Sequence, residues 1–198
     1  EIAFALHLEN GEYTSGSYFS YFIWGSTQIK AEYRNAPDGV PVSSNQWFLY
    51  SDDFIGFLKR SKELGDQRTD VTYMERTGVS DMYEVIQWPN KLIGNISTGT
   101  IVWEQDFILY RYAQYYTMLV ELRYHRKDYS GALTALNTLA QRAYGKANFH
   151  TDSSAAAVRQ ALVDENLKEF AEEGNVYFTL TDGSVITVAK RTDFYLIC

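Results

Sequence analysis

The spacing of apolar residues divides this chain into a strand, a long irregular region and a helical region. The N-terminus has the alternation that is typical of a β-strand, with apolar residues at Ile2, Phe4, Leu6 and Leu8. Asn10-Gly11 predicts a turn directly after it. From residue 13 to residue 42 the chain is rich in Gly, Ser and Tyr without a sustained period, so we expect loops there.

A short helix is predicted between residues 51 and 64. Ser51 and the two aspartates after it suit a helix start, a basic turn follows, and Gly65 suits the helix end. The next stretch, up to Thr100, is irregular, with short strands expected near residues 71–74 and 83–88.

Helical spacing dominates from Asp106 to Gly174. Three amphipathic segments are predicted over residues 106–122, over residues 132–143, and from Ser153 or Ser154 to Gly174. Asp106 is the expected cap of the first helix, and Gly145 is placed to end the second. Since the first connection is short, the first two helices should pack antiparallel. A pair followed by a further helix is typical of tetratricopeptide-like folds.

After Gly174 the pattern changes back to that of strands. Residues 176–180 alternate, Asp182-Gly183 is a strong hairpin signal, and residues 185–188 suit a return strand. We expect a hairpin and strand tail over residues 175–198.

Composition excludes several classes of function. The 198 residues are 45% hydrophobic and 22% charged, which is enough for one globular domain or a substantial piece of a larger one. A net charge of -7 disfavours a nucleic-acid partner. The single cysteine, Cys198, and the scattered histidines, His7, His125 and His150, lack metal-ligand spacing, so we expect no metal, no cofactor and ordinary surface or boundary histidines. No apolar run is long enough for a transmembrane helix.

Four charged residues lie on or beside the apolar stripes of the predicted helices: Arg111, Arg142, Glu165 and Glu169. Burying an unpaired charge costs several kcal/mol, so each needs a partner. They could form an acid–base pair, but carboxylates that face arginines have depressed pKa values and are poor proton donors. We therefore interpret these residues as structural ion pairs between helices, with no catalytic residue among them.

Aromatic residues make up 16% of the chain and crowd two of the expected loops. Exposed rings held on a scaffold can stack on sugar rings, so the glycan-binding candidates are Tyr18, Tyr21, Trp24, Trp47 and Tyr50. The alternative is that these rings fill the space between the loops and the helices as part of a core.

Several motifs resemble, in order and spacing, the SusD/RagB family of Bacteroidetes. The similar segments are Glu1-Ile2-Ala3-Phe4-Ala5-Leu6, Gly65-Asp66-Gln67-Arg68, Arg111-Tyr112-Ala113-Gln114 with Glu121, Ala132-Leu133 with Leu136-Asn137 and Arg142-Ala143, and Glu165 with Glu169-Phe170-Ala171, Glu173-Gly174 and Leu180. They match the C-terminal portion of a typical member. The chain departs from the family pattern at Ala140 and Asn166, and at Val176 and Thr179 after Gly174, thinning an ion-pair network of the family.

The resemblance implies a mainly α fold of the SusD kind, with tetratricopeptide-type helical pairs, long loops and a few short strands. Residues 1–198 would be one C-terminal region: a ligand-side region over 1–105, a helical scaffold over 106–174 and a tail over 175–198, with the N-terminal part of the natural protein absent. It also implies a non-enzymatic lipoprotein on the outer-membrane surface. Such a protein binds glycans for nutrient uptake and delivers them to a SusC-like TonB-dependent transporter.

Two other functions remain open on the residues alone. One is a tetratricopeptide-like protein-interaction scaffold that does not bind sugar. The other is a glycoside hydrolase, which would need two carboxylates flanking a cleft.

Overall fold

A computed structural model describes residues 2–7, 23–43, 49–91, 93–97, 99–103 and 106–173. The chain divides into two compact units. Unit 1 comprises Glu1–Phe4, Gly56–Thr69 and Leu109–Cys198, and unit 2 comprises Ala5–Ile55 and Asp70–Ile108. Each unit is described by itself below.

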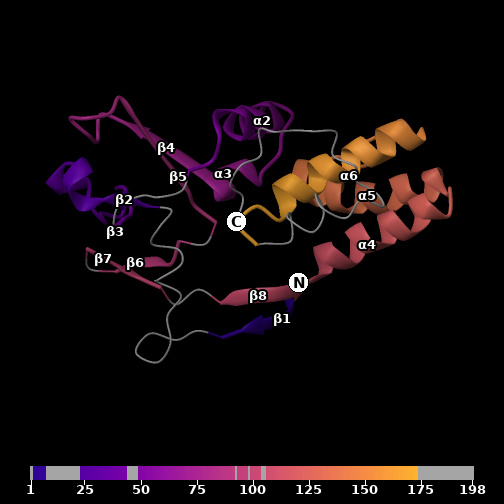
Figure 1. Cartoon of the computed structure of the whole chain (residues 1–198), viewed down its shortest axis with the longest axis horizontal. Coiled ribbons are helices and arrows are strands. Elements are labelled where there is room, and N and C mark those ends of the chain that lie inside the picture. Colours follow the sequence, from indigo (N-terminus) through magenta and orange to yellow (C-terminus); the bar gives the residue numbers. More distant parts are fainter. Residues whose placement is uncertain are drawn as a thin grey trace. The chain divides into compact units, whose positions relative to one another are not determined.

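Three helices that pack side by side form the body of unit 1 (Figure 1). They are α4 (Tyr112–His125), α5 (Tyr129–Tyr144) and α6 (Ala155–Glu169). Their shared core consists of Val120, Ala132, Ala135, Leu136, Val158 and Leu162, all of them buried. The two alanines are small enough for the helices to approach closely, which fits the tight packing of a helical pair.

The helix ends follow from local capping chemistry. The N–H of Gly131 donates to Oδ1 of Asp128 over 3.0 Å at the start of α5, and the N–H of Ala157 donates to Oγ of Ser154 over 3.3 Å at the start of α6. Gly145 ends α5 with a left-handed φ of 65°, as its position predicts. The predicted end of the third helix at Gly174 was wrong, because α6 ends at Glu169.

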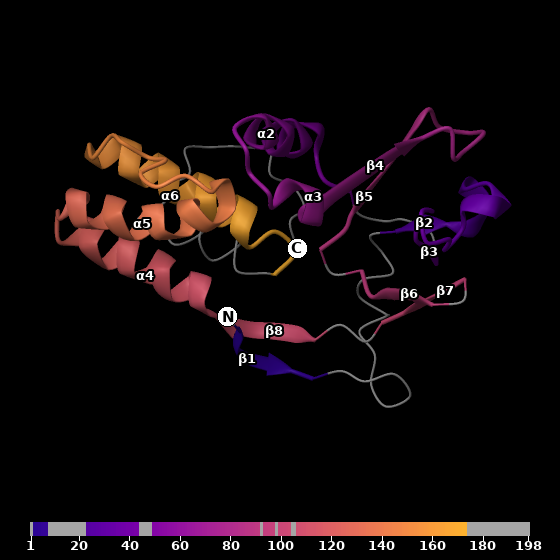
Figure 2. The ribbon, with the colours of Figure 1, turned by 180° about the vertical axis from the view of Figure 1, so that it is seen from behind.

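The predicted start of the first helix was also wrong. Residues Phe107–Arg111 form strand β8, which pairs with β1 (Ile2–Leu6), and α4 begins only at Tyr112. The two strands lie side by side in both views (Figure 2). The large aromatic and aliphatic side chains of β8 suit a strand, and β1 supplies the backbone partner. Asp106 therefore caps no helix; its carboxylate lies 2.8 Å from Nδ1 of His7.

The predicted helix between residues 51 and 64 is confirmed as α2 (Asp52–Glu63). The segment after α2 belongs to unit 1 and is hydrogen-bonded to the C-terminal end of α5 and to the residue after it. The backbone N–H of Gln67 donates to the carbonyl of Ala143, and Nζ of Lys146 donates to the carbonyl of Leu64, each over 3.0 Å. This contact between distant parts of the sequence brings Asp66 and Arg68 to the helices.

Unit 2 is built from short strands and turns. The hairpin of β4 (Tyr73–Thr77) and β5 (Val85–Pro89) is antiparallel and sets Met74 opposite Trp88. β2 (Trp24–Gly25) runs parallel to β3 (Val42–Ser43), and β6 (Asn95–Ser97) pairs with β7 (Thr100–Val102). The strand expected at residues 71–74 begins only at Tyr73, because Thr69–Thr72 form the helical turn α3.

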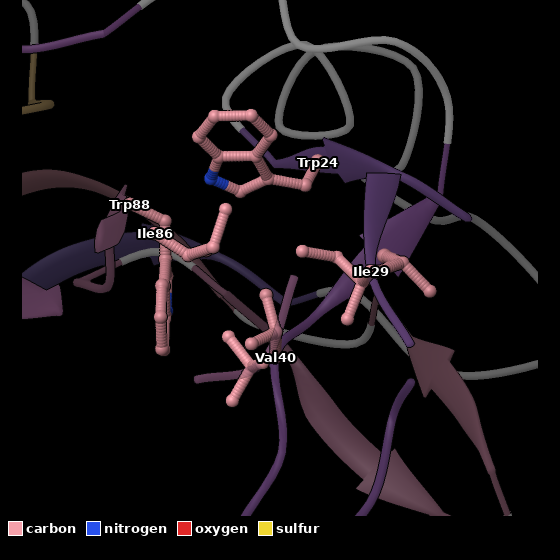
Figure 3. Close-up of a cluster of buried hydrophobic side chains, with 7 residues drawn as sticks. Trp24, Ile29, Val40, Ile86 and Trp88 are labelled. Atoms are coloured by element: carbon pink, nitrogen blue, oxygen red, sulfur yellow. The ribbon is translucent and has the colours of Figure 1, made fainter. Parts of the chain in front are cut away.

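The expected loops over residues 13–42 contain regular structure from Trp24 onward. Besides β2 and β3, two 3-10 turns span Ser26–Gln28 and Ala31–Tyr33. Trp24 of β2 gathers with Ile29, Val40, Ile86 and Trp88 in the core of unit 2 (Figure 3). The turn predicted at Asn10-Gly11 and the hairpin tail predicted over residues 175–198 lie outside the described residues.

Candidate functional site

The charged residues that interrupt the apolar stripes lie together in unit 1. Oε1 of Glu169, at the end of α6, accepts hydrogen bonds from Nη1 of Arg111 and from Nη2 of Arg142. Its other oxygen, Oε2, accepts from Nη1 of Arg68 over 3.0 Å. One carboxylate therefore joins β8, α5, α6 and the turn after α2.

A second carboxylate, Glu165, lies one helical turn earlier on α6 and is completely buried, at 0% exposure. Its Oε2 lies 2.8 Å from Nη2 of Arg68, and its Oε1 lies 2.8 Å from Nζ of Lys168. Oε1 also accepts a hydrogen bond from the hydroxyl of Tyr144 and faces Nε2 of His150, each at 3.3 Å.

Two bidentate pairs complete the cluster, which we call the ion cluster. Arg68 donates from Nε and Nη2 to the two oxygens of Asp66, over 2.9 and 2.7 Å. Arg111 donates from Nε and Nη2 to the two oxygens of Glu173, each over 2.8 Å. The ion cluster thus matches four cations with four carboxylates: Arg68, Arg111, Arg142 and Lys168 with Asp66, Glu165, Glu169 and Glu173.

The carboxylates of the ion cluster are held ionised. Burial by itself raises a carboxyl pKa, but here the hydrogen bonds and the facing positive charges outweigh it. The pKa of Glu169 is lowered to about 2, and the pKa of Glu165 lies well below its usual range. Burial opposes the charge of Arg68 and Arg111 as well, yet their carboxylate partners raise the pKa of both guanidinium groups.

These shifts decide what the ion cluster can do chemically. A carboxylate whose pKa lies far below the working pH is a poor general acid, and a buried one that is already bonded to cations is a poor base. Of the four residues singled out in the sequence, Arg111 and Arg142 form ion pairs with Glu169. Glu165 forms its ion pairs with Arg68 and Lys168 instead.

Sequence reasoning missed several members of the ion cluster. Lys168 follows Glu165 by three residues on α6, a spacing that indicates a pair on one face of a helix. His150 is a boundary residue whose side chain is 17% exposed, and its Nε2 faces Oε1 of Glu165. For the Asp66-x-Arg68 segment the only signal was the family motif, which did not show its partners. Ala140 and Asn166, where the family pattern has arginines, are buried.

Two of the five glycan-binding candidates lie in cores. Trp24 and Tyr50 are each 7% exposed. The indole of Trp24 donates to the carbonyl of Gln87 over 2.8 Å, and the ring of Tyr50 meets Phe54 edge to face at 4.9 Å. For these two rings the structure shows the core alternative. The remaining candidates, Tyr18, Tyr21 and Trp47, lie outside the described residues.

The described residues contain no group of three or more His, Cys, Asp or Glu side chains arranged to hold a metal ion. None of the helices in the described part of the chain is long and apolar enough to cross a membrane.

The family model described as SusD family matches residues 70–181, more than half of the chain. The chain belongs to the SusD family. Its predicted mainly α, SusD-like fold is confirmed by the crystal structure of a SusD superfamily protein from Bacteroides fragilis NCTC 9343. The two align with a TM-score of 0.69 at 22% sequence identity.

That alignment covers 91% of this chain but only 40% of the Bacteroides fragilis chain, so the sequence spans less than half the length of this SusD superfamily member. No curated protein matches the chain.

Proposed function

We propose that this chain is part of a protein that binds glycans on the outer-membrane surface and does not transform them. The observation that carries the proposal is the SusD family match over residues 70–181, together with the SusD-like fold. Proteins of this family are associated with carbohydrate binding in nutrient uptake. In this proposal the whole protein is a surface lipoprotein that delivers oligosaccharides or polysaccharides to a SusC-like TonB-dependent transporter.

The ion cluster supports binding without hydrolysis. A glycoside hydrolase needs one carboxyl group that is protonated at the working pH and a second that remains ionised. Glu165 and Glu169 are both held ionised and are both enclosed by cations. We therefore expect the protein to release no chromophore from chromogenic glycosides.

Tyr18, Tyr21 and Trp47 are the proposed stacking residues. The test is a glycan array probed with the full-length gene product, followed by titration of each bound glycan while tryptophan emission is recorded. Replacing Tyr18, Tyr21 and Trp47 with alanine together should abolish binding, because sugar stacking needs the flat rings. The matched control is Tyr110→Ala, which removes an exposed tyrosine of unit 1 and should leave binding unchanged.

The array also tests the alternative of a protein-interaction scaffold. A glycan binder responds to sugars in the absence of other proteins, whereas a scaffold responds only to a partner protein. If no glycan binds and a protein partner is captured from the outer membrane, the glycan-binding proposal is wrong and the scaffold alternative holds.

A further inference from the structure

The tip of the β4–β5 hairpin in unit 2 exposes two large side chains next to each other. β4 ends at Thr77 and β5 begins at Val85, and between them Met82 is 65% exposed and Tyr83 is 41% exposed. Single exposed apolar residues are ordinary on protein surfaces. What distinguishes this tip is how firmly its backbone and its tyrosine ring are held.

Ser80 fixes the backbone of the tip. Its buried hydroxyl donates to the carbonyl of Gln28 over 2.6 Å. The same oxygen accepts from the N–H groups of Met82 and Tyr83 over 3.1 and 3.3 Å. One side chain therefore holds both exposed residues and joins them to a distant segment of unit 2.

Lys30 holds the tip from the same distant segment. Its backbone N–H donates to the carbonyl of Val79, and its Nζ donates to the carbonyl of Gly78, each over 3.0 Å. The ring of Tyr83 packs against the buried indole of Trp24, with 5.0 Å between the ring centroids. A ring that is already fixed loses little conformational entropy when a ligand binds to it.

Acidic side chains lie on both sides of Tyr83 in the sequence. Asp81 is 84% exposed at its side chain and lies 3.3 Å from Nζ of Lys30, and Glu84 is also exposed. Their carboxylate oxygens can accept hydrogen bonds from hydroxyl groups. Two carboxylates against one ammonium leave the tip negative, so an acidic ligand is repelled.

We propose that the hairpin tip is a subsite for an uncharged glycan, in which Tyr83 stacks on a sugar ring and Asp81 and Glu84 accept hydrogen bonds from its hydroxyl groups. The proposal rests on the proposed glycan binding and adds described residues and a charge class to it. A stacking site needs a rigid flat ring with polar groups beside it, which the tip supplies. A protein interface takes about 20 residues from each partner, far more than this pair of exposed side chains.

The test uses the full-length gene product on an array of uncharged gluco-, manno-, galacto- and xylo-oligosaccharides and of uronic-acid oligosaccharides. The uncharged glycan that binds most tightly is then titrated calorimetrically. Tyr83→Ala and Tyr83→Leu should each weaken binding about tenfold, whereas Tyr83→Phe should stay within about twofold, because only the flat ring is needed. Leucine still covers Trp24, so it separates lost stacking from a disturbed loop. Tyr110→Ala in unit 1 is the control and should bind like the parent.

Hydroxyl-radical footprinting shows whether the glycan covers the tip. The same glycan at saturation should protect Met82 from oxidation and leave Met118, which is 57% exposed in unit 1, unprotected. If glycans bind but Tyr83→Leu binds as tightly as the parent, or if only acidic glycans bind, the subsite is overturned while glycan binding stands. If no glycan binds and a partner protein protects Met82, both proposals are wrong.

Discussion

Unit 1 joins four cationic and four anionic side chains between its helices, whereas the core of unit 2 is built from tryptophans and aliphatic residues. An apolar core tolerates many arrangements of similar volume, and its stability follows the apolar area that it removes from water. A buried ion cluster is different, because each charge has to meet its partner with good geometry.

The two kinds of core specify the structures of their units in different ways. In unit 1, Glu169 has hydrogen-bonding partners on three other segments, so a misplaced segment would leave a buried charge without a partner. In unit 2, Trp24 and Trp88 fill space beside Ile86 (Figure 3), and the indole of Trp24 needs one acceptor only. We expect the two units to respond differently to acid and to substitution.

Acid should have the largest effect, and it should act on unit 1. The folded-state pKa values of Asp66, Glu165 and Glu169 are lowered, so their contribution to stability is fully present above the unfolded-state values near 4 to 4.5. It is lost as the pH falls through this range to about 2, the folded-state pKa of Glu169. Each tenfold difference in proton affinity between the folded and unfolded states corresponds to about 1.4 kcal/mol of stability.

Two spectroscopic signals separate the units in this titration. Circular dichroism at 222 nm reports mainly the long helices of unit 1, whereas all four tryptophans belong to unit 2. As the pH is lowered, the helical signal should fall before tryptophan emission changes. Loss of both signals at the same pH would show that the units unfold together and that the comparison fails.

Glu169→Ala should destabilise the protein by about 3–5 kcal/mol, because it leaves Arg68, Arg111 and Arg142 without a shared acceptor. The free energy of unfolding is measured by urea titration followed at 222 nm. Glu63→Ala, which removes an exposed carboxylate from α2, is the control and should change stability by less than about 0.5 kcal/mol. Equal effects of the two substitutions would contradict the structural role of the ion cluster.

Ile86→Ala should destabilise unit 2 by about 3 kcal/mol, because Ile86 is 0% exposed and its removal leaves a cavity between Trp24 and Trp88. The midpoint of the urea transition in tryptophan emission should fall accordingly. Val85→Ala is a matched control on the same strand, since Val85 is 38% exposed. A midpoint for Ile86→Ala no lower than that of Val85→Ala would rule out this core.

Arg142→Ala should have the smallest effect, about 1 kcal/mol, because its side chain is 43% exposed and water screens much of its attraction to Glu169. A calorimetric scan should show a lower melting temperature, and the glycan array should show unchanged binding. An unaltered melting temperature would mean that Arg142 adds nothing to the ion cluster, and a loss of glycan binding would place it in the ligand site.

The sequence predicted helix ends well where they depend on a capping residue. Ser154 and Gly145 bound helices as expected because capping depends on a few neighbouring atoms. Residues 107–111 were assigned to a helix because their apolar spacing fits one, but β1, about a hundred residues earlier in the sequence, pairs with them as a strand. Local spacing cannot reveal a partner that lies so far along the chain.

Part of the ion cluster could likewise be predicted from the sequence, and part could not. The positions of Arg111, Arg142, Glu165 and Glu169 on apolar stripes indicated that each needs an opposite charge. The spacing of three residues between Glu165 and Lys168 indicates that pair. Arg68 could not be chosen from spacing, because the turn after α2 reaches α5 only through tertiary contacts. Trp24 was a candidate for stacking on sugar, and only the packing of unit 2 places its ring in a core.

The order of the motifs along the sequence indicated the family, and the apolar period indicated the helical region. Charged residues on apolar stripes indicated which charges have to be paired, because burying an unpaired charge is costly. The folded structure decided which of these charges meet and which aromatic rings are buried. These outcomes depend on contacts between residues that are distant in the sequence, and such contacts form only when the chain is folded.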